Sequence, residues 1–437
     1  MNQPLPPEPA PVPAASSQAL LAQFRPGDAL FASPTGTLLG RGVAHRCRTA
    51  DASPASLSRA VETLFDQARR AGRQAPVIMG VIPFEPRAPA HLFIPETLSR
   101  HAPGPDDAAP SASAPLTTAA AGMAAEPSPG HYCQAVAQAL ELFETTALEK
   151  VVLARSLRIE TPTPVETASL MRRLCAINPR GYNFALPAPE GDAFGGDNGA
   201  EYRDAESASL VGASPELLIR REGLRVTANP LAGSTPRHPE AAEDRRRAEA
   251  LARSEKDLRE HALVVEAIVN ALRPLCRTLD VPDGPEVIAT DRLWHLSTRL
   301  EGTLAAPAMS SLAVAAALHP TPAVCGAPQK AALEAIRSLE GRPRGWFTGL
   351  VGWCDERGDG EWAIAIRCAE VAAERVRLFA GAGIVPGSSP EGELAETATK
   401  MRTLLDAMGL EYEDAPAGEP KESDRGAHVA TDRRRSP

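Results

Sequence analysis

The sequence lacks the features that place a chain in a membrane or direct it out of the cell. No run approaches the roughly 18 consecutive apolar residues of a membrane-spanning helix. The Pro- and Ala-rich start, residues 1–17, has neither the basic beginning nor the apolar segment of a signal peptide. From these absences we expect a cytoplasmic protein that does not bind a membrane.

Paired cysteines and an excess of positive charge are lacking too. The seven cysteines are odd in number and scattered, without a Cys-x-x-Cys spacing, so we expect reduced thiols rather than disulfides or a zinc site. The net charge of −9 argues against an extended basic surface for nucleic acid. The arginine clusters at residues 245–247 and 433–435 are typical of a solvated helix face and a disordered tail.

Apolar sequence, in contrast, is plentiful enough for a large core. With 437 residues, of which 43% are hydrophobic, the chain can form one big domain or two ordinary ones. We predict disordered tails at residues 1–17 and 411–437 and a flexible Ala/Pro-rich insertion at about residues 102–129. Because the part before this insertion is short of core-forming segments, we predict a single domain over residues 18–410. A Gly/Asp-rich piece at residues 191–206 is predicted to be a surface insertion.

Short apolar runs bounded by Gly, Pro and Asp turns alternate with amphipathic segments of helical period. Strands and hairpins are predicted at residues 28–47, 77–82, 91–94, 150–157, 182–186 and 209–231. Helices are predicted at residues 53–71, 132–148, 167–177, 240–275 and 327–339. Mostly antiparallel strands with interspersed helices indicate an α+β fold with a large sheet.

The stretch near the C-terminus carries the densest chemical signal. Polar turns separate apolar runs that predict three consecutive antiparallel strands, at residues 346–355, 361–368 and 377–385. In the middle run, the period of two gives one face four residues: Glu361, Ala363, Ala365 and Arg367. A face of small residues that ends in an arginine is a poor core, but it suits the wall of a pocket for an anion.

The third run and the helix after it add further groups that recognise ions. Gly381 and Gly383 end the strand, where bare backbone can approach a ligand and offer N–H groups to a carboxylate. In the helical run, Glu393, Glu396 and Lys400 share one face. Two carboxylates and an ammonium can hold Mg²⁺ and steady an anionic substrate. The same spacing is also typical of a solvated helix face with a Glu–Lys pair.

A helix that begins at Ser254 has an ionisable first turn on an otherwise apolar stripe. The stripe starts with Asp257, Glu260 and His261 and continues with aliphatic residues at helical spacing. If the stripe is buried, these acids enter the protein beside its core and need a cation or metal as a partner. The alternative is a protruding first turn whose acids favour the helix N-terminus.

Two charged residues interrupt apolar strands. Lys150 begins one strand, and Glu216 follows Ser-Pro within another. A lysine and a glutamate of this kind can form an acid–base pair at neutral pH, if burial lowers the pKa of the lysine and raises that of the glutamate. Taken singly, each is also typical of a charge that protects a strand edge.

Together, these segments resemble the chorismate-utilising enzyme family, most closely its isochorismate-forming branch. The resemblance covers roughly residues 132–410. The matching motifs stand in the family's order at residues 148–155, 212–216, 230–234, 254–261, 318–326, 349–354, 360–368, 379–385 and 393–400. It implies an α+β chorismate-binding catalytic domain in which two large antiparallel sheets form a two-layer core with helices outside.

The resemblance also implies the reaction and a role for each residue. The reaction is the Mg²⁺-dependent conversion of chorismate to isochorismate, in which water adds at ring C2 and the C4 hydroxyl leaves. Lys150 would be the base for water and Glu216 the acid for the leaving hydroxyl. The Mg²⁺ ligands would come from three glutamates: Glu260, Glu393 and Glu396. The residues that would bind or lie close to the substrate are Gly212, Ala213, Ser214, His319, Ala323, Val324, Arg367, Gly381, Gly383 and Lys400.

Within the family, the resemblance favours supply of isochorismate to siderophore synthesis, through 2,3-dihydroxybenzoate or salicylate. The alternatives are a salicylate synthase, which goes on to eliminate pyruvate, and an isochorismate synthase of the menaquinone pathway. The partners implied are chorismate and a downstream isochorismatase or isochorismate pyruvate lyase, with the chain itself expected to be a monomer. A non-catalytic binding relative is disfavoured, since Lys150, Glu216 and the three glutamates are all present.

Overall fold

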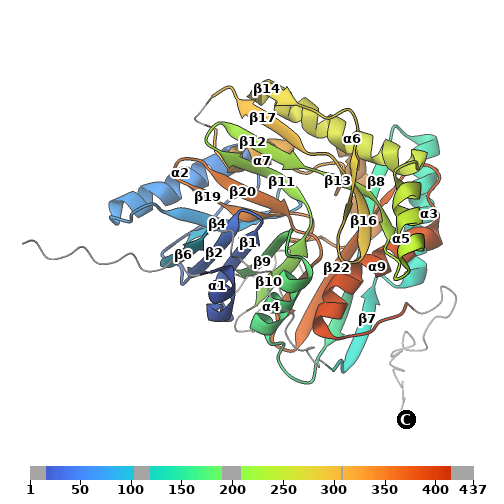
Figure 1. Ribbon diagram of the computed structural model, residues 1–437, viewed down its shortest axis with the longest axis horizontal. Coiled ribbons are helices and arrows are strands. Elements are labelled where there is room, and N and C mark those ends of the chain that lie inside the picture. Colours follow the sequence, from blue (N-terminus) through green and yellow to red (C-terminus); the bar gives the residue numbers. More distant parts are fainter. Residues whose placement is uncertain (1–15, 103–118, 189–207, 307–308, 415–437) are drawn as a thin grey trace, which may run out of the picture.

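The computed structural model describes residues 16–102, 119–188, 208–306 and 309–414, and its strands form two large antiparallel sheets and one small one (Figure 1). The first sheet runs in the order β18 (Gly326–Ala327), β8 (Lys150–Glu160), β22 (Arg375–Ile384), β21 (Cys368–Ala372), β10 (Ser209–Ser214), β9 (Tyr182–Pro187), β1 (Ala29–Ser33), β2 (Gly36–Arg41), β6 (Thr97–His101), with β7 (Gly122–Glu126) also on β8. The second runs in the order β14 (Cys276–Asp280), β17 (Leu300–Leu304), β12 (Arg225–Asn229), β11 (Leu217–Glu222), β20 (Gly360–Ile364), β19 (Leu350–Asp355), β4 (Val77–Ile82), β5 (His91–Ile94), β3 (His45–Arg48). The small sheet is β13 (Leu231–Pro236), β16 (Leu293–Ser297) and β15 (Glu286–Ala289).

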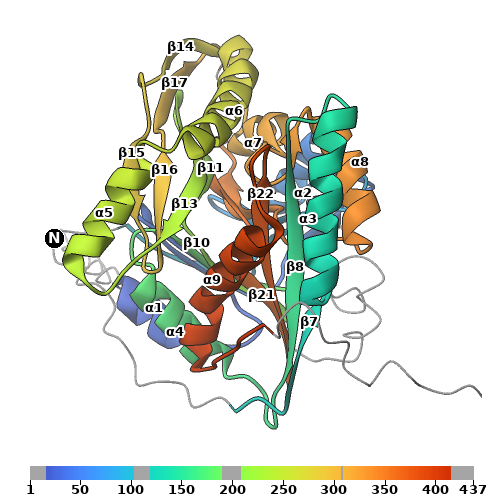
Figure 2. The ribbon, with the colours of Figure 1, turned by 90° about the vertical axis from the view of Figure 1, so that its right-hand side faces the viewer.

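Helices cover the outer faces of the sheets, as Figure 2 shows for α3, α8 and α9 beside β8 and β22. Their bounds are α1 (Ser17–Gln23), α2 (Pro54–Arg70), α3 (Pro129–Thr145), α4 (Thr167–Ile177), α5 (Ala241–Leu251), α6 (Glu255–Leu272), α7 (Ser311–Leu318), α8 (Gln329–Glu340) and α9 (Pro390–Met408). A 3₁₀ turn, Arg273–Leu275, follows α6. The predicted α+β fold with large antiparallel sheets is therefore confirmed. Within the described residues, the helices are all too short or too polar to cross a membrane.

Local chemistry explains where the helices begin. Ser53 caps α2 by accepting a hydrogen bond from the backbone N–H of Ser56, and Pro54 occupies the first helical position. Ser254 caps α6 in the same way, accepting from the N–H of Asp257. The stripe predicted on α6 is buried at His261 and at the aliphatic residues after it, so the helix packs with its first turn close to the interior.

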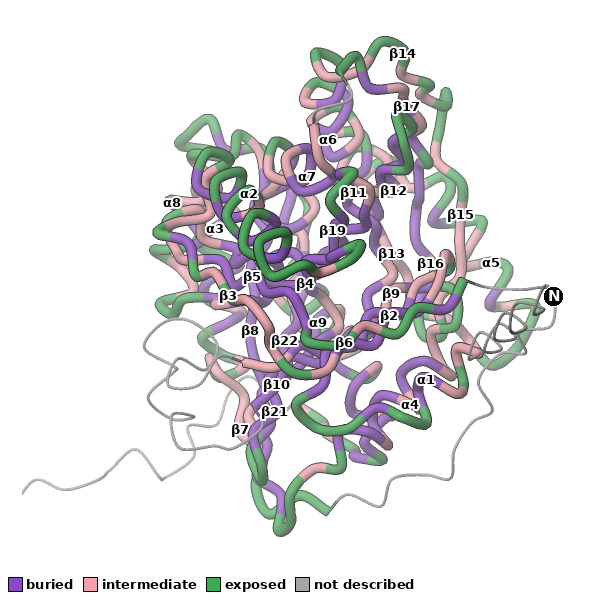
Figure 3. Tube along the Cα trace, turned by 90° about the vertical axis from the view of Figure 1, so that its left-hand side faces the viewer, coloured by how far each residue is buried: buried purple, intermediate pink, exposed green. Residues whose placement is uncertain are grey.

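The core has one layer between the two large sheets and further layers under the helices. The inner layer takes side chains from both sheets, among them Phe31, Phe184, Val351 and Ala363. Figure 3 shows that the strands at the centre are mostly buried and that the exposed positions lie on the outer helices and turns.

The predicted strand over residues 361–368 is wrong, because the chain changes sheets in its middle. β20 ends at Ile364 in the second sheet, and β21 begins at Cys368 in the first. Between them Arg367 has a φ of +50°, which breaks the extended alternation. Glu361 was predicted to share a pocket-facing side of the strand with Arg367. In the structure it accepts hydrogen bonds from the hydroxyls of Ser33 and Thr35, at 2.7 Å each.

A second crossing lies beside the first. β10 and β11 belong to different sheets and are joined through Pro215 and Glu216. The two crossings are hydrogen-bonded to each other: Ile364 donates to the carbonyl of Glu216 at 3.2 Å, and Ala213 donates to the carbonyl of Arg367 at 3.0 Å.

The predicted insertions and tails lie mostly outside the described residues. This holds for residues 103–118 of the Ala/Pro-rich segment, for residues 191–206, and for all but the inner ends of the two tails. The part of the first segment that is described corrects the prediction, because residues 122–126 form β7 and pair with β8.

Candidate active site

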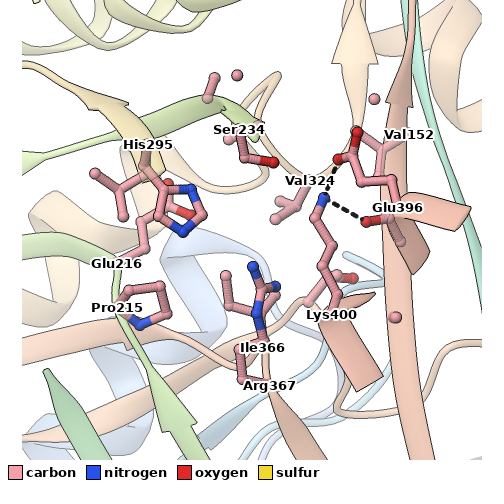
Figure 4. Close-up of a pocket in the computed structure, with 18 of the residues that line it drawn as sticks. Val152, Pro215, Glu216, Ser234, His295, Val324, Ile366, Arg367, Glu396 and Lys400 are labelled. Atoms are coloured by element: carbon pink, nitrogen blue, oxygen red, sulfur yellow. Dashed lines mark hydrogen bonds and ion pairs between the residues drawn. The ribbon is translucent and has the colours of Figure 1, made fainter. Parts of the chain in front are cut away.

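A cavity opens beside the two crossings, between the first sheet, the small sheet and the N-terminal halves of α6 and α9 (Figure 4). It brings together nine of the residues singled out in the sequence: Glu216, Glu260, Ala323, Val324, Arg367, Gly381, Gly383, Glu396 and Lys400. These residues come from segments up to about 180 positions apart in the chain, so only the fold gathers them.

Lys150 lies immediately behind the cavity wall, at the first position of β8. Its side chain is fully buried, and its Nζ is 2.8 Å from Oε1 of Glu260 on α6. Gly383 makes this approach feasible, since a Cβ there would lie 2.3 Å from the same Glu260 oxygen and 3.2 Å from Cε of Lys150. The glycine is therefore required by packing against the ion pair.

Glu216 projects into the cavity from the crossing between β10 and β11. It is only 3% exposed, and burial raises the pKa of its carboxyl to about 7. A hydrogen bond from the backbone of Leu231 and the positive charges of Lys150 and Arg367 limit the rise. A large share of the Glu216 side chains therefore carries a proton at neutral pH and can donate it.

Arg367 enters from the other crossing, facing the same space as Glu216 (Figure 4). Burial lowers the pKa of its guanidinium to about 10, so the group keeps its charge at neutral pH. A cation held at a fixed backbone turn suits a carboxylate of a ligand.

Glu396 and Lys400 form the opposite wall, one turn apart on α9. Lys400 Nζ lies 2.6 Å from Oε1 of Glu396 and donates to the carbonyl of Gly381 at 2.8 Å. Burial alone would raise the pKa of Glu396, but the charge and hydrogen bond of Lys400 outweigh it and the pKa is lowered. The Glu–Lys pair thus faces a cavity and is not a solvated helix face.

Glu393 does not line the cavity, although it is buried nearby. Its carboxylate accepts a hydrogen bond from Lys256 at 3.0 Å, and burial together with the charge of Glu396 raises its pKa. Asp257, on α6, also has a raised pKa, through burial and the charges of Glu260 and Glu396. The acids of α6 and α9 therefore form one cluster whose members repel one another.

Three lysines balance this cluster. Glu260 is paired with Lys150, Glu393 with Lys256, and Glu396 with Lys400. Over the described ranges, no three acidic, histidine or cysteine side chains are gathered closely enough to hold a metal ion by themselves. The donors that face the cavity, Glu260 and Glu396, are carboxylates, which suit a hard cation such as Mg²⁺.

Four predicted substrate residues do not line the cavity. A Cβ at Gly212 would lie 2.4 Å from the ring of Phe184, so this glycine serves packing between strands. Ala213 belongs to the core on the other face of the sheet. Ser214 accepts a hydrogen bond from the backbone N–H of Glu216 at 3.2 Å, and so holds the crossing. His319 is buried at the end of α7 against Phe84, where burial lowers its pKa to about 3.

The cavity also contains residues that the sequence did not single out as site residues. His295 of β16 lies beside Glu216 (Figure 4), and burial, with the charges of Arg367 and Lys400, lowers its pKa well below the usual value. Others are Val152, Phe347, Thr348, Ile366 and the first residues of β13, 231–234. A histidine inside the short apolar run at residues 293–297 was the one local signal for His295.

Comparisons with known proteins point to one family. The sequence profile of chorismate binding enzymes matches residues 94–406. The chain is 42% identical to isochorismate synthase DhbC of Bacillus subtilis, over 91% of this chain and 97% of that protein. It is 43% identical to the vibriobactin-specific isochorismate synthase of Vibrio cholerae, over 88% of this chain and 92% of that one. The crystal structure of DhbC from Bacillus anthracis superposes with a TM-score of 0.83 at 42% identity, covering 90% of this chain and all of that one.

Proposed function

This chain belongs to the family of chorismate-binding enzymes, and we propose that it is an isochorismate synthase. The reaction adds water at ring C2 of chorismate while the C4 hydroxyl leaves and the ring double bonds shift, so no atoms are gained or lost overall. The observation that carries the proposal is the acid–base arrangement. A buried lysine and a buried carboxyl whose pKa is raised to about 7 serve one cavity from different elements.

We assign opposite proton transfers to these two residues. Lys150 takes a proton from the water that attacks C2, and Glu216 gives its proton to the departing C4 hydroxyl. The raised pKa of Glu216 supports its role, because an acid works best when its pKa lies near the working pH. His295, whose pKa is low, stays neutral beside it and leaves the positive charge in the cavity to Arg367 and Lys400.

We propose that the reaction depends on a metal ion and that this ion is Mg²⁺. Glu260 and Glu396 would hold it, with Glu393 nearby. Mg²⁺ commonly takes only one or two protein carboxylates and fills its shell with water and substrate oxygens, so two cavity glutamates suffice. When bound, Mg²⁺ neutralises the ring carboxylate of the substrate. Lys150 and Lys400, which pair with these glutamates here, would then turn to water and substrate.

The remaining cavity residues would bind and orient chorismate. Arg367, Lys400 and the backbone at Gly381 and Gly383 would receive its two carboxylates, and Ala323 and Val324 would line the ring. For the pathway, the relatives described as 2,3-dihydroxybenzoate-specific and vibriobactin-specific support supply of isochorismate to siderophore synthesis, with a downstream isochorismatase or pyruvate lyase as consumer.

The test is to incubate the purified protein with chorismate, with and without Mg²⁺, and to separate the products. The proposal expects isochorismate, formed only with the metal. Stoichiometric salicylate and pyruvate would make the protein a salicylate synthase, and absence of any conversion would refute the assignment. Lys150→Ala and Glu216→Ala should each abolish turnover in a folded protein, whereas full activity in either would remove that residue from the mechanism.

A further inference from the structure

The edge of β8 next to the active site is left without a strand partner over a short stretch. β18 pairs with β8 only at residues 150 and 151, and β7 pairs with it only at residues 156–160. Between these two, Val152 and Ala154 point their backbone groups away from β22, toward an edge where the described chain supplies no strand. The N–H of Val152 donates to the carbonyl of Cys325 at 2.8 Å, which leaves the carbonyl of Val152 and the N–H of Ala154. Buried backbone groups require partners, so something else must complete this edge.

An ion pair takes the place of the missing strand. Glu340, the last residue of α8, accepts the N–H of Ala154 at 2.8 Å, and Arg344 donates to the carbonyl of Val152 at 2.7 Å. The guanidinium also donates through Nε to Glu340, at 2.9 Å for the shorter contact. Carboxylate and guanidinium thus act as the acceptor and donor that a neighbouring strand would present.

The same guanidinium reaches two other walls of the cavity. Its Nη1 donates to the carbonyl of Val324 at 2.7 Å and to the hydroxyl of Thr348 at 3.2 Å. Val152, Val324 and Thr348 all line the cavity, whereas Arg344 does not. Arg344 is 5% exposed and lies with its guanidinium carbon 4.3 Å from the ring centre of Phe84. One buried cation therefore joins three segments of the cavity wall, in addition to the backbone bonds by which Cys325 and β18 hold to β8.

We propose that Arg344, held by Glu340, is a positioning residue for the reaction of the neighbouring cavity. Together with the backbone bonds of Cys325 and β18 to β8, it fixes the spacing between the strand that begins with Lys150 and the turn at Val324. This is the spacing between the base and the wall assigned to the substrate ring. The proposal rests on the proposed function, because it concerns the geometry of that chemistry. Arg344 itself touches neither the substrate space nor the proton path.

The chemistry of the side chain explains why an arginine stands here. The planar guanidinium has five N–H donors in a rigid fork, and these reach Val152, Val324, Thr348 and Glu340 at once. A lysine ammonium has three donors on a single atom and cannot span acceptors on three segments. Without the guanidinium, the carbonyls of Val152 and Val324 lose a partner in a buried place, and the turn at Val324 is held to β8 only by the backbone bonds of Cys325 and β18.

A second cavity behind Arg344 offers a direct way to test this role. It has a volume of about 530 Å³ and is lined by Glu340, Arg344, Phe347 and residues of β8 and β22. Truncation of Arg344 would open a space continuous with this cavity, so a small guanidinium compound in solution could enter it and bind beside Glu340.

The experiment compares Arg344→Ala, Arg344→Lys and the control Arg221→Ala. Arg221 is also a buried arginine that binds a carboxylate, Asp359, and a backbone carbonyl, Arg357, but it lines no part of the active-site cavity. Steady-state kinetics with chorismate are measured with and without ethylguanidinium at millimolar concentration, and thermal unfolding is measured in parallel.

For Arg344→Ala we expect kcat/KM to fall about 10- to 100-fold, since small misplacements of reacting groups cost rates of this size. Ethylguanidinium should restore at least about a third of the lost activity, and Arg344→Lys should stay folded with a raised KM. Arg221→Ala should lose thermal stability but keep kcat/KM within about twofold and show no rescue.

Three outcomes would overturn the inference: Arg344→Ala with kinetics like the wild type, a loss explained by the unfolded fraction alone, or equal rescue of the control. If Arg344→Ala does not fold, the proposal is tested by amide hydrogen exchange at Ala154 in two variants of Glu340. Glu340→Gln, which keeps an acceptor, should leave the Ala154 amide of β8 protected, and Glu340→Ala should expose it to faster exchange together with a raised KM. A wild type that does not convert chorismate would refute the proposed function rather than this inference.

Discussion

The active-site cavity and the part of the protein around it use different cations for the same kind of acidic partner. We call the surrounding part the frame; its arginine–carboxylate pairs include Arg155–Asp414, Arg221–Asp359 and Arg344–Glu340. Around the cavity, lysines pair with glutamates: Lys150 with Glu260, Lys256 with Glu393, and Lys400 with Glu396. In the frame, arginines bind the carboxylates. The chain has five lysines against 41 arginines, so three of its five lysines at one place cannot follow from composition.

The two kinds of pair also differ in geometry. Arg155 donates to Asp414 through two nitrogens, at 2.7 and 2.6 Å. Arg344 donates to Glu340 and to three further acceptors. Each of the three lysines contacts one carboxylate oxygen, and Lys400 also donates to the carbonyl of Gly381. The arginine pairs hold segments together, whereas the lysine pairs are simple enough to exchange one partner for another.

The two kinds of pair match what each region must do. A lysine can give up its proton when its surroundings favour the neutral form, and its flexible stem lets it release a carboxylate to a metal ion. An arginine keeps its proton at any ordinary pH and holds its partners in a fixed plane. The carboxylates beside the cavity are therefore paired with cations that can change partner, and those of the frame with cations that hold theirs fixed; Arg367, the arginine in the cavity, is left to face a ligand.

The largest effect on kcat should come from replacing Lys150 by arginine, the cation of the frame. In Lys150→Arg the charge and the contact with Glu260 can be kept, but the guanidinium does not lose a proton. We expect kcat to fall by about 10³-fold or more with thermal stability near that of the wild type, because the base is lost and not the ion pair. Stopped assays of isochorismate formation at saturating chorismate give the value.

The control is Lys330→Arg, the same exchange at an exposed position on α8, which should leave kcat unchanged. Substantial turnover in Lys150→Arg would show that proton abstraction by Lys150 is not required, and the comparison between the two regions would fail.

A smaller effect is expected from removing a charge that the cavity lysines balance. Glu396→Gln should raise the Mg²⁺ concentration needed for half-maximal activity by about 10- to 100-fold, because one carboxylate of the proposed ion site is lost. Calorimetric titration of the metal without substrate provides a second readout. Glu391→Gln, on the exposed first turn of the same helix, serves as the control. An unchanged metal titration in Glu396→Gln would contradict the proposed ligand.

The pH dependence of kcat should follow the protonation state of the Glu216 carboxyl. Because the acid must be protonated and its pKa is about 7, kcat should decline as pH rises through about 7, approaching a tenfold loss per pH unit well above it. A plateau that extends beyond pH 9 would exclude Glu216 as the acid with this pKa.

The same shift predicts a stability effect with a definite sign. The pKa of Glu216 is higher in the folded chain than the ordinary 4.5, so its contribution to stability is lost as pH rises from about 4.5 to about 7. Glu216→Gln, which cannot ionise, should therefore be more stable than the wild type at pH 8, by an amount on the order of 3 kcal/mol at most. The difference should shrink toward pH 4.5, as measured by urea unfolding at both pH values. Equal stability at pH 8 would contradict the raised pKa.

The smallest kinetic effect should come from replacing an arginine of the frame, Arg221, by lysine. Arg221→Lys should lower the free energy of unfolding by about 1–2 kcal/mol, since a lysine cannot keep the bonds to both Asp359 and the carbonyl of Arg357. Its kcat should stay within about twofold of the wild type. A kinetic loss larger than the loss of stability explains would place this frame pair in the reaction.

Much of the fold could be predicted from the sequence, because its signals are local. Ser53 with Pro54 and Ser254 with Asp257 are caps that determine helix starts by short-range hydrogen bonds. The change of sheet at Arg367 could not be predicted, since alternating apolar residues continue through it and a positive φ at an arginine has no sequence signal. β7 was missed for a similar reason: its partner, β8, supplies the order that its Ala-rich sequence does not indicate.

The candidate site was predictable where a charge interrupts an apolar segment, as at Lys150, Glu216 and Arg367. It was not predictable at Gly212, where the small side chain reflects packing against Phe184, or at His319, whose burial against Phe84 has no local sign. Arg344 could not be identified from the sequence either, because the carbonyls to which it donates, those of Val152 and Val324, are distant from it in the chain.

The two crossings between the sheets have a consequence for how the molecule unfolds. Glu216 and Arg367 stand on adjacent crossings that are hydrogen-bonded to each other, so each large sheet contains part of the cavity and neither contains all of it. Loss of order in one sheet would pull apart the acid and the cation that the other sheet holds in place. In rising denaturant, the protein should therefore be a mixture of fully active and fully inactive molecules, with activity and structure disappearing at the same midpoint.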